Sequence, residues 1–116
     1  MKRGQVYLAN LNLGKCTEPG KTRPVFIVQD QALIDVKHPS TLITPLTTQL
    51  IDNAEPLRVR ISTKEKLNKT SDLLIDQLRA IDNRRLIEDP LLQCSDEFMG
   101  HVEQCMQAVL SIQTLN

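Results

Sequence analysis

The run QVYLANL at residues 5–11 sets the fold class, because it is short and apolar on both sides of an extended chain. Val6 and Leu8 fall on one side of this run, while Tyr7 and Ala9 fall on the other. Similar runs recur at residues 24–28, 41–44, 57–61, 73–75 and 79–81, the last two being separate short strands or one bent strand. Short apolar runs separated by polar segments are typical of a mainly β protein.

Prolines and polar segments mark the expected boundaries of these strands. Pro24 cannot donate to a strand ladder, so it fits the start of one strand, and Pro45 fits the end of the next. Residues 12–23 are rich in Gly, Pro, Lys and Thr, and we expect them to form a long loop or hairpin. Residues 30–40 are expected to form a second loop.

One segment, at the C-terminal end, has a helical pattern over a useful length. Ser95 is a good N-cap, and Asp96 and Glu97 place negative charge in the first turn, where it is favoured. Apolar residues then recur at three- and four-residue steps and form one face: Phe98, Met99, Val102, Met106, Val109 and Leu110. Many short strands with one terminal helix predict a small, curled, largely antiparallel β-barrel with the helix packed on it.

Length and composition indicate a single domain over residues 1–116 with one hydrophobic core. The chain is 41% hydrophobic and 24% charged, which is ordinary for a globular protein. It contains no apolar run near the roughly 18 residues of a membrane span. Residues 1–5 lead directly into the first strand, without the apolar stretch of a secretion signal. We therefore expect a cytoplasmic protein.

The three cysteines, Cys16, Cys94 and Cys105, are expected to be free thiols in a reducing compartment. None of them belongs to a C-x-x-C pair, and the chain has only two histidines, so the sequence gives little support for a structural zinc site.

The zero net charge conceals an asymmetry between the two parts of the chain. Residues 1–70 carry 11 Lys and Arg against 6 Asp and Glu, whereas residues 71–116 carry 3 against 8. Arg58 and Arg60 alternate onto one face of a predicted strand, and three lysines follow them: Lys64, Lys66 and Lys69. This basic region either attracts a polyanion such as RNA or an acidic peptide, or is an ordinary solvated face.

Conventional catalytic sets are mostly absent. Nothing in the pattern pairs His38 with His101 for acid–base chemistry. Asp72 and Asp76 are candidates for a carboxylate metal site, but the same spacing on a strand also arises from a solvated face. With four glycines in the chain, no glycine-rich phosphate loop is present.

The polar residues at two strand boundaries can be interpreted either as functional or as purely structural. Arg23 precedes an apolar strand, where a permanently protonated guanidinium can fork onto two phosphate oxygens or can be a plain surface group. Thr47 and Thr48 follow another strand, where a pair of threonines forms either a turn or part of a site.

Four segments, taken in order, extend this reading: residues 2–7 (KRGQVY), 17–25 (TEPGKTRPV), 43–47 (ITPLT) and 71–86, which contains IDQLRAIDNRRL. Together they resemble the MazF/PemK (Kid) family of toxin endoribonucleases from type II toxin–antitoxin modules. Each segment is weak by itself, but their order and spacing in a chain of this length make the match specific.

The resemblance implies an SH3-like β-barrel with a C-terminal helix, the CcdB/MazF/PemK-type fold, assembled as a homodimer. It also implies an mRNA interferase that arrests growth. Such an enzyme uses no metal or other cofactor. It cleaves single-stranded RNA at short sequences through attack of the 2′-OH, leaving a 2′,3′-cyclic phosphate and a 5′-hydroxyl. The implied second partner is an antitoxin whose acidic C-terminal tail covers the RNA groove.

The resemblance also implies roles for particular residues. The catalytic set is Arg23 at the scissile phosphate, Thr47 bonding the same phosphate, and Asp76 in proton transfer. The substrate-binding set is Thr17, Glu18, Lys21, Gln77 and Arg79.

Departures from the family patterns favour the MazF-like arrangement over the Kid-like one. The Kid-like branch has an arginine where this chain has Leu74, and a histidine in an early loop, whereas no histidine here precedes His38. Cys16-Thr17 replaces the family's Gly-Ser, which keeps the hydroxyl and loses the glycine.

Two other functions stay open at this point. One is a CcdB-like poison of DNA gyrase, although that family ends in Trp-Gly-Ile and this chain has no tryptophan. The other is a degenerate module that binds an antitoxin without cutting RNA.

Overall fold

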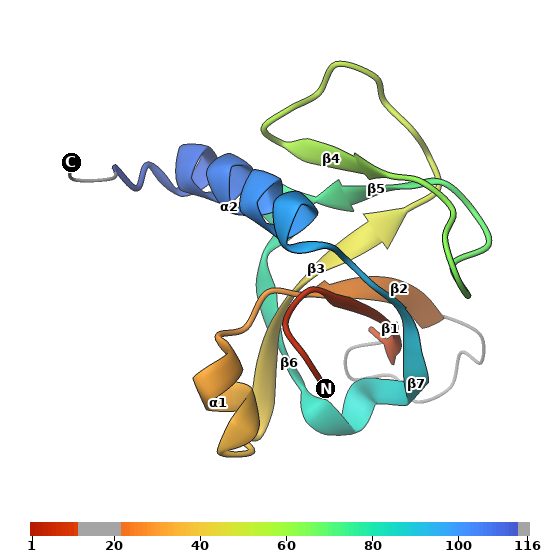
Figure 1. The fold of residues 1–116 in the computed structure, drawn as a ribbon, viewed down its shortest axis with the longest axis vertical. Helices are drawn as coiled ribbons and strands as arrows, with labels where there is room; N and C mark the ends of the chain where they lie inside the picture. The colour runs from red at the N-terminus through yellow and green to blue at the C-terminus, as the bar shows by residue number, and fades with distance from the viewer. Residues whose placement is uncertain (12–21, 114–116) are drawn as a thin grey trace.

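The computed structural model of the chain describes residues 1–11 and 22–113. Within them, seven strands form one curved antiparallel sheet in the order β4-β5-β3-β2-β1-β7, and β6 also pairs with β3 (Figure 1). The strands are β1 (Gln5–Asn10), β2 (Thr22–Ile27), β3 (Ser40–Thr47), β4 (Arg58–Ile61), β5 (Ser71–Leu74), β6 (Arg79–Asp82) and β7 (Leu86–Gln93). The helices are α1 (Gln31–Asp35) and α2 (Asp96–Leu110), and two single 3-10 turns are η1 (Ile75–Gln77) and η2 (Asn83–Arg85).

The long strand β3 organises the sheet, because three other strands pair with it. One of its edges pairs with β2, while the other edge pairs first with β6, up to Ile43, and then with β5, from Leu46. Pro45 lies inside β3, so the prediction that it ends the strand was wrong. The proline is tolerated because it falls in the gap between the β6 and β5 pairings, where that edge has no ladder.

Strand β2 begins at Thr22, two residues earlier than the sequence predicted. Pro24 therefore lies within the strand, opposite Leu8 of β1, rather than at its start. The pairing of β2 with β3 runs only from Val25 to Ile27, so Pro24 interrupts no ladder on that side. As a consequence Arg23 belongs to a strand, opposite Ala9, and not to a loop.

The predicted runs around residues 73–75 and 79–81 are two separate strands, β5 and β6, joined by η1. Two elements had no counterpart in the sequence-based prediction. Helix α1 lies in the expected loop 30–40, and its first residue follows an Asp30 that makes no side-chain cap. Strand β7 was missed because charged residues and a proline interrupt it. Glu88 there has a positive φ of 59°, and the β1–β7 register shifts nearby, as at a β-bulge.

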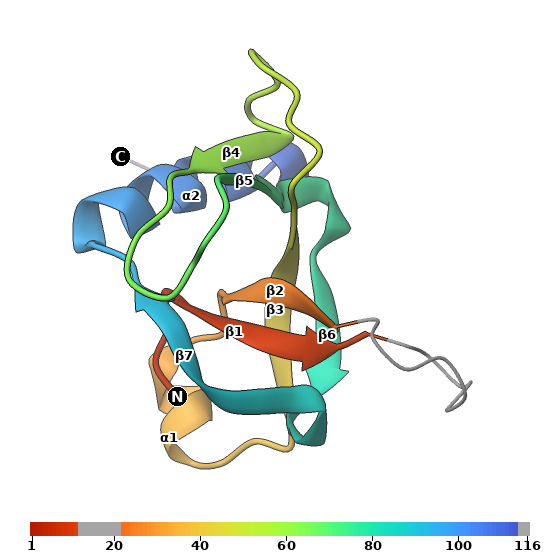
Figure 2. The same ribbon diagram turned by 90° about the vertical axis from the view of Figure 1, so that its right-hand side faces the viewer.

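Helix α2 begins as the sequence predicted. The Ser95 side-chain oxygen accepts a hydrogen bond from the Phe98 N–H at 3.1 Å, which caps the first turn. The predicted apolar face packs on the sheet, with Val102 fully buried. Leu110 is the exception, because it is 49% exposed, and Cys105 is buried in its place. Figure 2 shows α2 lying along the β4–β5 pair.

Two apolar clusters stabilise the two faces of the curved sheet. The cluster beneath α2 includes Val6, Phe26, Leu46, Val59, Leu73 and Val102. The cluster on the opposite face includes Tyr7, Ala9, Val25, Ile27, Ile43 and Ile81. Alternation along each strand sends successive side chains into one cluster and then the other, which explains why both sides of the early runs are apolar.

The two ends of the sheet approach each other through a loop. The Lys66 N–H, in the connection from β4 to β5, donates to the Leu91 carbonyl of β7 at 2.9 Å. This contact links the β4 end of the strand order to the β7 end, so the sheet is curled as a small barrel is. Among the described residues, no helix has the length and apolar character needed to cross a membrane.

The N-terminal turn explains part of the first motif, residues 2–7. Gly4 has a φ of +86°, a backbone conformation that residues other than glycine rarely adopt. Its N–H donates to the Ile27 carbonyl at 2.8 Å, and its own carbonyl accepts from the Cys94 N–H at 3.0 Å. Arg3 forms a 3.0 Å ion pair with Glu103 of α2. Apart from Lys2, the residues of this motif therefore have roles in holding the fold together.

Candidate active site

A row of polar side chains crosses the sheet at the C-terminal end of β3. Thr47 lies directly opposite Asp72 of β5, and Asp72 lies directly opposite Arg60 of β4. Residues directly opposed in an antiparallel pair present their side chains to the same face. Thr47, Asp72 and Arg60 therefore point away from the α2 side, where their neighbours Leu46 and Leu73 are buried.

Arg23 extends this row on the other side of β3. The β2–β3 pairing ends where Val25 lies opposite Pro45, and two residues beyond that end the chain reaches Arg23 on β2 and Thr47 on β3, both on the face to which Val25 and Pro45 point. The Arg23 side chain is exposed, and it makes no hydrogen bond or ion pair with any other residue in the ranges 1–11 and 22–113. Its five N–H donors are thus available to a ligand.

Thr47 is half-buried, and the backbone of the following loop fixes its hydroxyl. The Thr47 side-chain oxygen accepts a hydrogen bond from the Gln49 N–H at 3.2 Å. The Gln49 carbonyl in turn accepts from the Arg58 guanidinium at 2.8 Å. The hydroxyl hydrogen of Thr47 is still free to be donated to an acceptor such as a phosphate oxygen.

Asp72 is the buried centre of the row, with a side chain 1% exposed. Its two oxygens accept hydrogen bonds from Arg60 Nε at 2.5 Å, from Arg58 at 3.3 Å and from the Ile51 N–H at 3.0 Å. Burial raises the pKa of Asp72, but the hydrogen bonds from Arg60, Ile51 and Arg58 outweigh it and hold the pKa below its ordinary value. Asp72 is therefore a paired carboxylate, and the interpretation of Asp72 as part of a solvated face was wrong.

Arg58 and Arg60 do share one face, as their alternation predicted, but they are not a free basic surface. Arg60 also pairs with Asp52 at 2.9 Å, and hydrogen bonds to Asp72 and Asp52 raise the pKa of its guanidinium. The two arginines thus stand beside two carboxylates. They line a polar pocket of about 560 Å³ together with Asp72 and the loop residues 51–55.

Positive charge without carboxylate partners lies behind the row. A cleft of about 330 Å³ is lined by Pro24 and Thr48, the chain neighbours of Arg23 and Thr47, together with Lys66 and Lys69. Both lysines are exposed, and neither forms an ion pair with another described residue. The basic character that the sequence predicted is therefore retained at these lysines.

The other predicted site residues lie elsewhere. Arg79 starts β6 opposite Ile43, four residues along β3 from Thr47, or about 13 Å at the usual rise of a strand. Because four is an even number of residues, Arg79 faces the same side of the sheet as Thr47. Asp76 and Gln77 are exposed on η1. None of these three side chains bonds another residue within the described part of the chain.

Three predicted substrate-binding residues, Thr17, Glu18 and Lys21, lie outside the described residues, as does Cys16. Of the predicted set, the fold places Arg23 and Thr47 at the same end of the neighbouring strands β2 and β3. Sequence reasoning missed the linking role of Arg58 and Asp72. A signal was present, because Asp72 is the one charged residue within the otherwise apolar run 72–75.

Solved structures define the class to which this fold belongs. An endoribonuclease in complex with its cognate antitoxin from a mycobacterial species is 21% identical, with a TM-score of 0.77 and 99% of each chain covered. MazE–MazF from Deinococcus radiodurans is 17% identical, with a TM-score of 0.76 and 97% of each chain covered. The expected MazF-like fold, mainly antiparallel β-sheet with a C-terminal helix, is confirmed.

Sequence comparison specifies the family. The profile described as "PemK-like, MazF-like toxin of type II toxin-antitoxin system" matches residues 2–110. Endoribonuclease MazF of Staphylococcus saprophyticus is 36% identical over 117 residues, which cover 99% of this chain and 95% of that protein. The chain therefore belongs to the PemK-like, MazF-like toxins of type II toxin–antitoxin systems, a family that includes endoribonucleases. The family expected from the four sequence segments is confirmed.

Proposed function

We propose that this toxin cleaves single-stranded RNA without a metal ion, and that Arg23 and Thr47 form the core of its active site. One observation carries the proposal. Arg23 and Thr47 lie just beyond the last paired residues of β2 and β3 on one face of the sheet; the Arg23 guanidinium bonds no other described residue, and the Gln49 backbone holds the Thr47 hydroxyl in place. An anion that bridges these two groups is the ligand that this arrangement fits best.

In the proposed reaction, the ribose 2′-oxygen attacks the adjacent phosphorus while the bond from phosphorus to the 5′-oxygen breaks. The products are a 2′,3′-cyclic phosphate and a 5′-hydroxyl. Arg23 stays protonated throughout and donates two hydrogen bonds to the non-bridging oxygens, where negative charge develops in the transition state. Thr47 donates its hydroxyl hydrogen to the same group and helps to fix the in-line geometry.

Two protons must move for the reaction to balance: one leaves the 2′-hydroxyl and one reaches the departing 5′-oxygen. We assign the first transfer to Asp76, an exposed carboxylate on η1 that bonds no other described side chain, and the second to a solvent water, which protonates the departing 5′-oxygen. This assignment rests on the family resemblance. If it holds, Asp76→Asn should cleave RNA more slowly while binding it with unchanged affinity.

RNA binding is proposed to use Thr17, Glu18 and Lys21 before β2, and Gln77 and Arg79 after β5. Lys66 and Lys69 add positive charge to the cleft beside Pro24 and Thr48. The chain is also proposed to form a homodimer and to act in the cytoplasm. Its cognate antitoxin would place an acidic C-terminal tail in the RNA groove. Arg23, Lys66 and Lys69 favour this placement, because they are positively charged and form no ion pair with another described residue.

The test is to incubate the purified toxin with a long single-stranded RNA in EDTA and to map the fragment ends. The proposal expects discrete cuts at one short sequence, cyclic-phosphate ends and loss of cutting in Arg23→Ala. Arg84→Ala is the matched control, because Arg84 is exposed and, among the described residues, forms an ion pair only with its sequence neighbour Asp82.

Two results would contradict the proposal. Activity that disappears in EDTA and returns with magnesium would indicate a carboxylate metal site instead. Intact RNA after incubation with a folded, antitoxin-free toxin would favour a non-cleaving antitoxin-binding module or a gyrase poison, which a supercoiling assay separates.

A further inference from the structure

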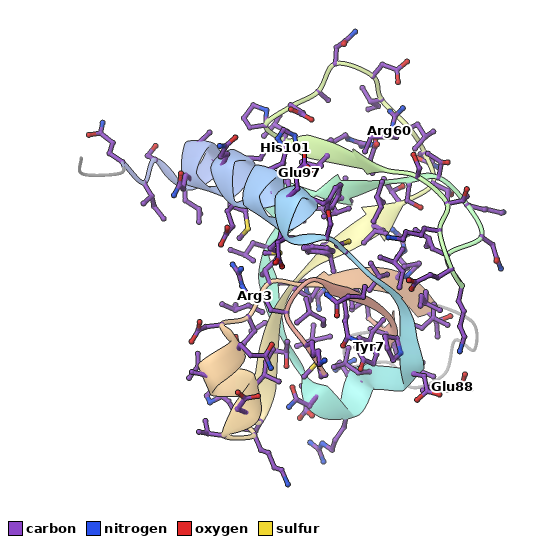
Figure 3. All side chains as sticks on the ribbon, in the orientation of Figure 1. Arg3, Tyr7, Arg60, Glu88, Glu97 and His101 are labelled. Carbon is purple, nitrogen blue, oxygen red and sulfur yellow. The ribbon has the colours of Figure 1, made fainter. Side chains whose placement is uncertain are left out.

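Three side chains with metal-binding atoms meet between α2 and the loop that joins β3 to β4. They are Glu55 of the loop and His101 and Cys105 of the helix, and their ligand atoms all lie within 4.8 Å of one another. His101 and Cys105 are four residues apart, so they project from the same face of α2. The loop leaves β3, arches away from the sheet and returns beside α2 (Figure 1), and Figure 3 shows His101 on this side of the helix.

We propose that Glu55, His101 and Cys105 form a binding site for a zinc-like transition-metal cation, separate from the RNA-cleaving site. Carboxylate, imidazole and thiolate are the three side-chain types that bind Zn²⁺. One carboxylate and one thiolate also balance the two positive charges of the ion. Three protein ligands leave a fourth tetrahedral position for water.

The structure prepares this site in part. The His101 ring nitrogen Nε2 lies 2.9 Å from a Glu55 oxygen, so two of the ligands already share one location. Both side chains are exposed, which leaves a path for a hydrated ion from solvent. Cys105 is 6% exposed and packs against the apolar cluster under α2, so it closes the inner side of the site.

Binding requires the loss of one proton. Burial raises the pKa of the Cys105 thiol, and the negative charge of Glu55 raises it further. The free thiol is therefore protonated at neutral pH. A bound cation replaces that proton, which passes to solvent, and the sulfur becomes a coordinated thiolate.

A cation at this position would fasten the loop 48–57 to α2. The same loop supplies the Gln49 N–H that binds Thr47 and the Ile51 N–H that binds Asp72. Occupancy would therefore restrain the segment that orients one end of the polar row. This role is structural or regulatory, and it stands whether or not the toxin cuts RNA.

The first test is titration of the metal-stripped full chain with Co²⁺, which reports thiolate coordination through a sulfur-to-cobalt charge-transfer band. We expect one equivalent per chain. His101→Gln and Cys105→Ser should each weaken binding by more than the roughly 10–100-fold caused by loss of an outer-shell partner. Cys94→Ser and His38→Gln are the matched controls, and both should keep the band.

Absence of binding by the folded chain would overturn the proposal. So would a band that survives Cys105→Ser or that is lost equally in Cys94→Ser, since the thiolate would then come from another residue. Because Cys105 is buried, its variant can lose stability, and Glu55→Gln and His101→Gln provide tests at exposed positions.

The second test measures hydrogen exchange in the loop with Zn²⁺ alone as the probe. Exchange at residues 50–57 should slow in the wild-type protein and stay unchanged in His101→Gln. Equal exchange with and without the ion in the wild-type protein would contradict the proposed restraint on the loop.

Discussion

The two ends of the polar row contain the same residue type in different environments. At the β4–β5 end, Arg58 and Arg60 bind a carboxylate that is almost fully buried. At the β2 end, Arg23 is exposed and bonds no other described residue. The difference follows from the neighbouring strand, because β5 places Asp72 opposite Arg60, whereas β1 places Ala9 opposite Arg23.

This comparison separates structural charge from charge that is available to a ligand. A guanidinium beside a buried carboxylate has its donors occupied, and removing either partner leaves an uncompensated charge. A guanidinium beside alanine keeps its donors for an external anion. Thr47 lies between the two regions, and the Gln49 backbone connects it to the arginine–aspartate cluster.

The largest effect on stability is expected from Asp72→Ala. It removes a buried carboxylate that accepts hydrogen bonds from Arg58, Arg60 and the Ile51 N–H. Because both arginines are partly exposed and Arg60 keeps Asp52 as a partner, we expect a loss of about 1.5–3 kcal/mol of unfolding free energy, the range for hydrogen bonds to charged groups. Urea denaturation of wild type and variant measures the change. Asp76→Ala, at an exposed position, should change stability by less than about 0.5 kcal/mol. Equal stabilities for Asp72→Ala and wild type would show that the cluster is not structural.

Arg23→Ala should lower the cleavage rate and leave the stability of the fold nearly unchanged. Cleavage should fall by roughly 10²–10³-fold, about 2.7–4 kcal/mol, as expected for loss of one preorganised donor. The unfolding free energy should stay within about 0.5 kcal/mol of wild type. Single-turnover cleavage and urea denaturation on the same preparation distinguish the two quantities. A folded variant that cuts at the wild-type rate would remove Arg23 from the active site.

Thr47→Val tests the residue between the two regions. The variant keeps the branched shape and loses one hydrogen bond to a charged phosphate oxygen, worth about 1.5–3 kcal/mol, so cleavage should slow by roughly 10–150-fold. Thr47→Ser keeps the hydroxyl and should cut at nearly the wild-type rate. If valine and serine variants slow equally, the methyl group rather than the hydroxyl is what matters.

The smallest effect concerns an exposed arginine–aspartate pair. Hydrogen bonds from the Arg84 side chain and backbone lower the pKa of Asp82 from 3.8 to about 2. A lowered pKa stabilises the folded state above pH 3.8, and this contribution is lost as the pH falls towards 2. Asp82→Asn should therefore lower Tm slightly at pH 6, and the difference from wild type should disappear near pH 2. A difference that persists at pH 2 would mean that charge is not its cause.

The fold could be predicted where local patterns are strong. Alternation in β1 and β4 and the cap at Ser95 gave the correct elements, since each depends on neighbouring residues. Strand β7 was missed because its pairing with β1 overrides a local sequence, Glu88-Asp89-Pro90, that disfavours strands. The position of Pro45 was misread because the gap between β5 and β6 depends on the tertiary pairing.

The candidate site could be predicted in part. The resemblance singled out Arg23 and Thr47, which lie just beyond the paired ends of β2 and β3 on the same face of the sheet. The alternation of Arg58 and Arg60 gave their common face correctly. The hydrogen bonds that the two arginines donate to Asp72 could not be predicted, because the cross-strand register between β4 and β5 is set by long-range packing rather than by local sequence.

The Gln49 link has a consequence for how this toxin tolerates mutation. Both of its hydrogen bonds, to Thr47 and from Arg58, use main-chain atoms. Almost any side chain at position 49 therefore preserves the connection, and proline alone removes the donor N–H. An alanine scan of the loop would therefore show no effect at position 49, although the hydrogen bonds that connect the two halves of the row are made by this residue. The connection is robust to genetic drift because the polypeptide backbone, which all residues share, carries it.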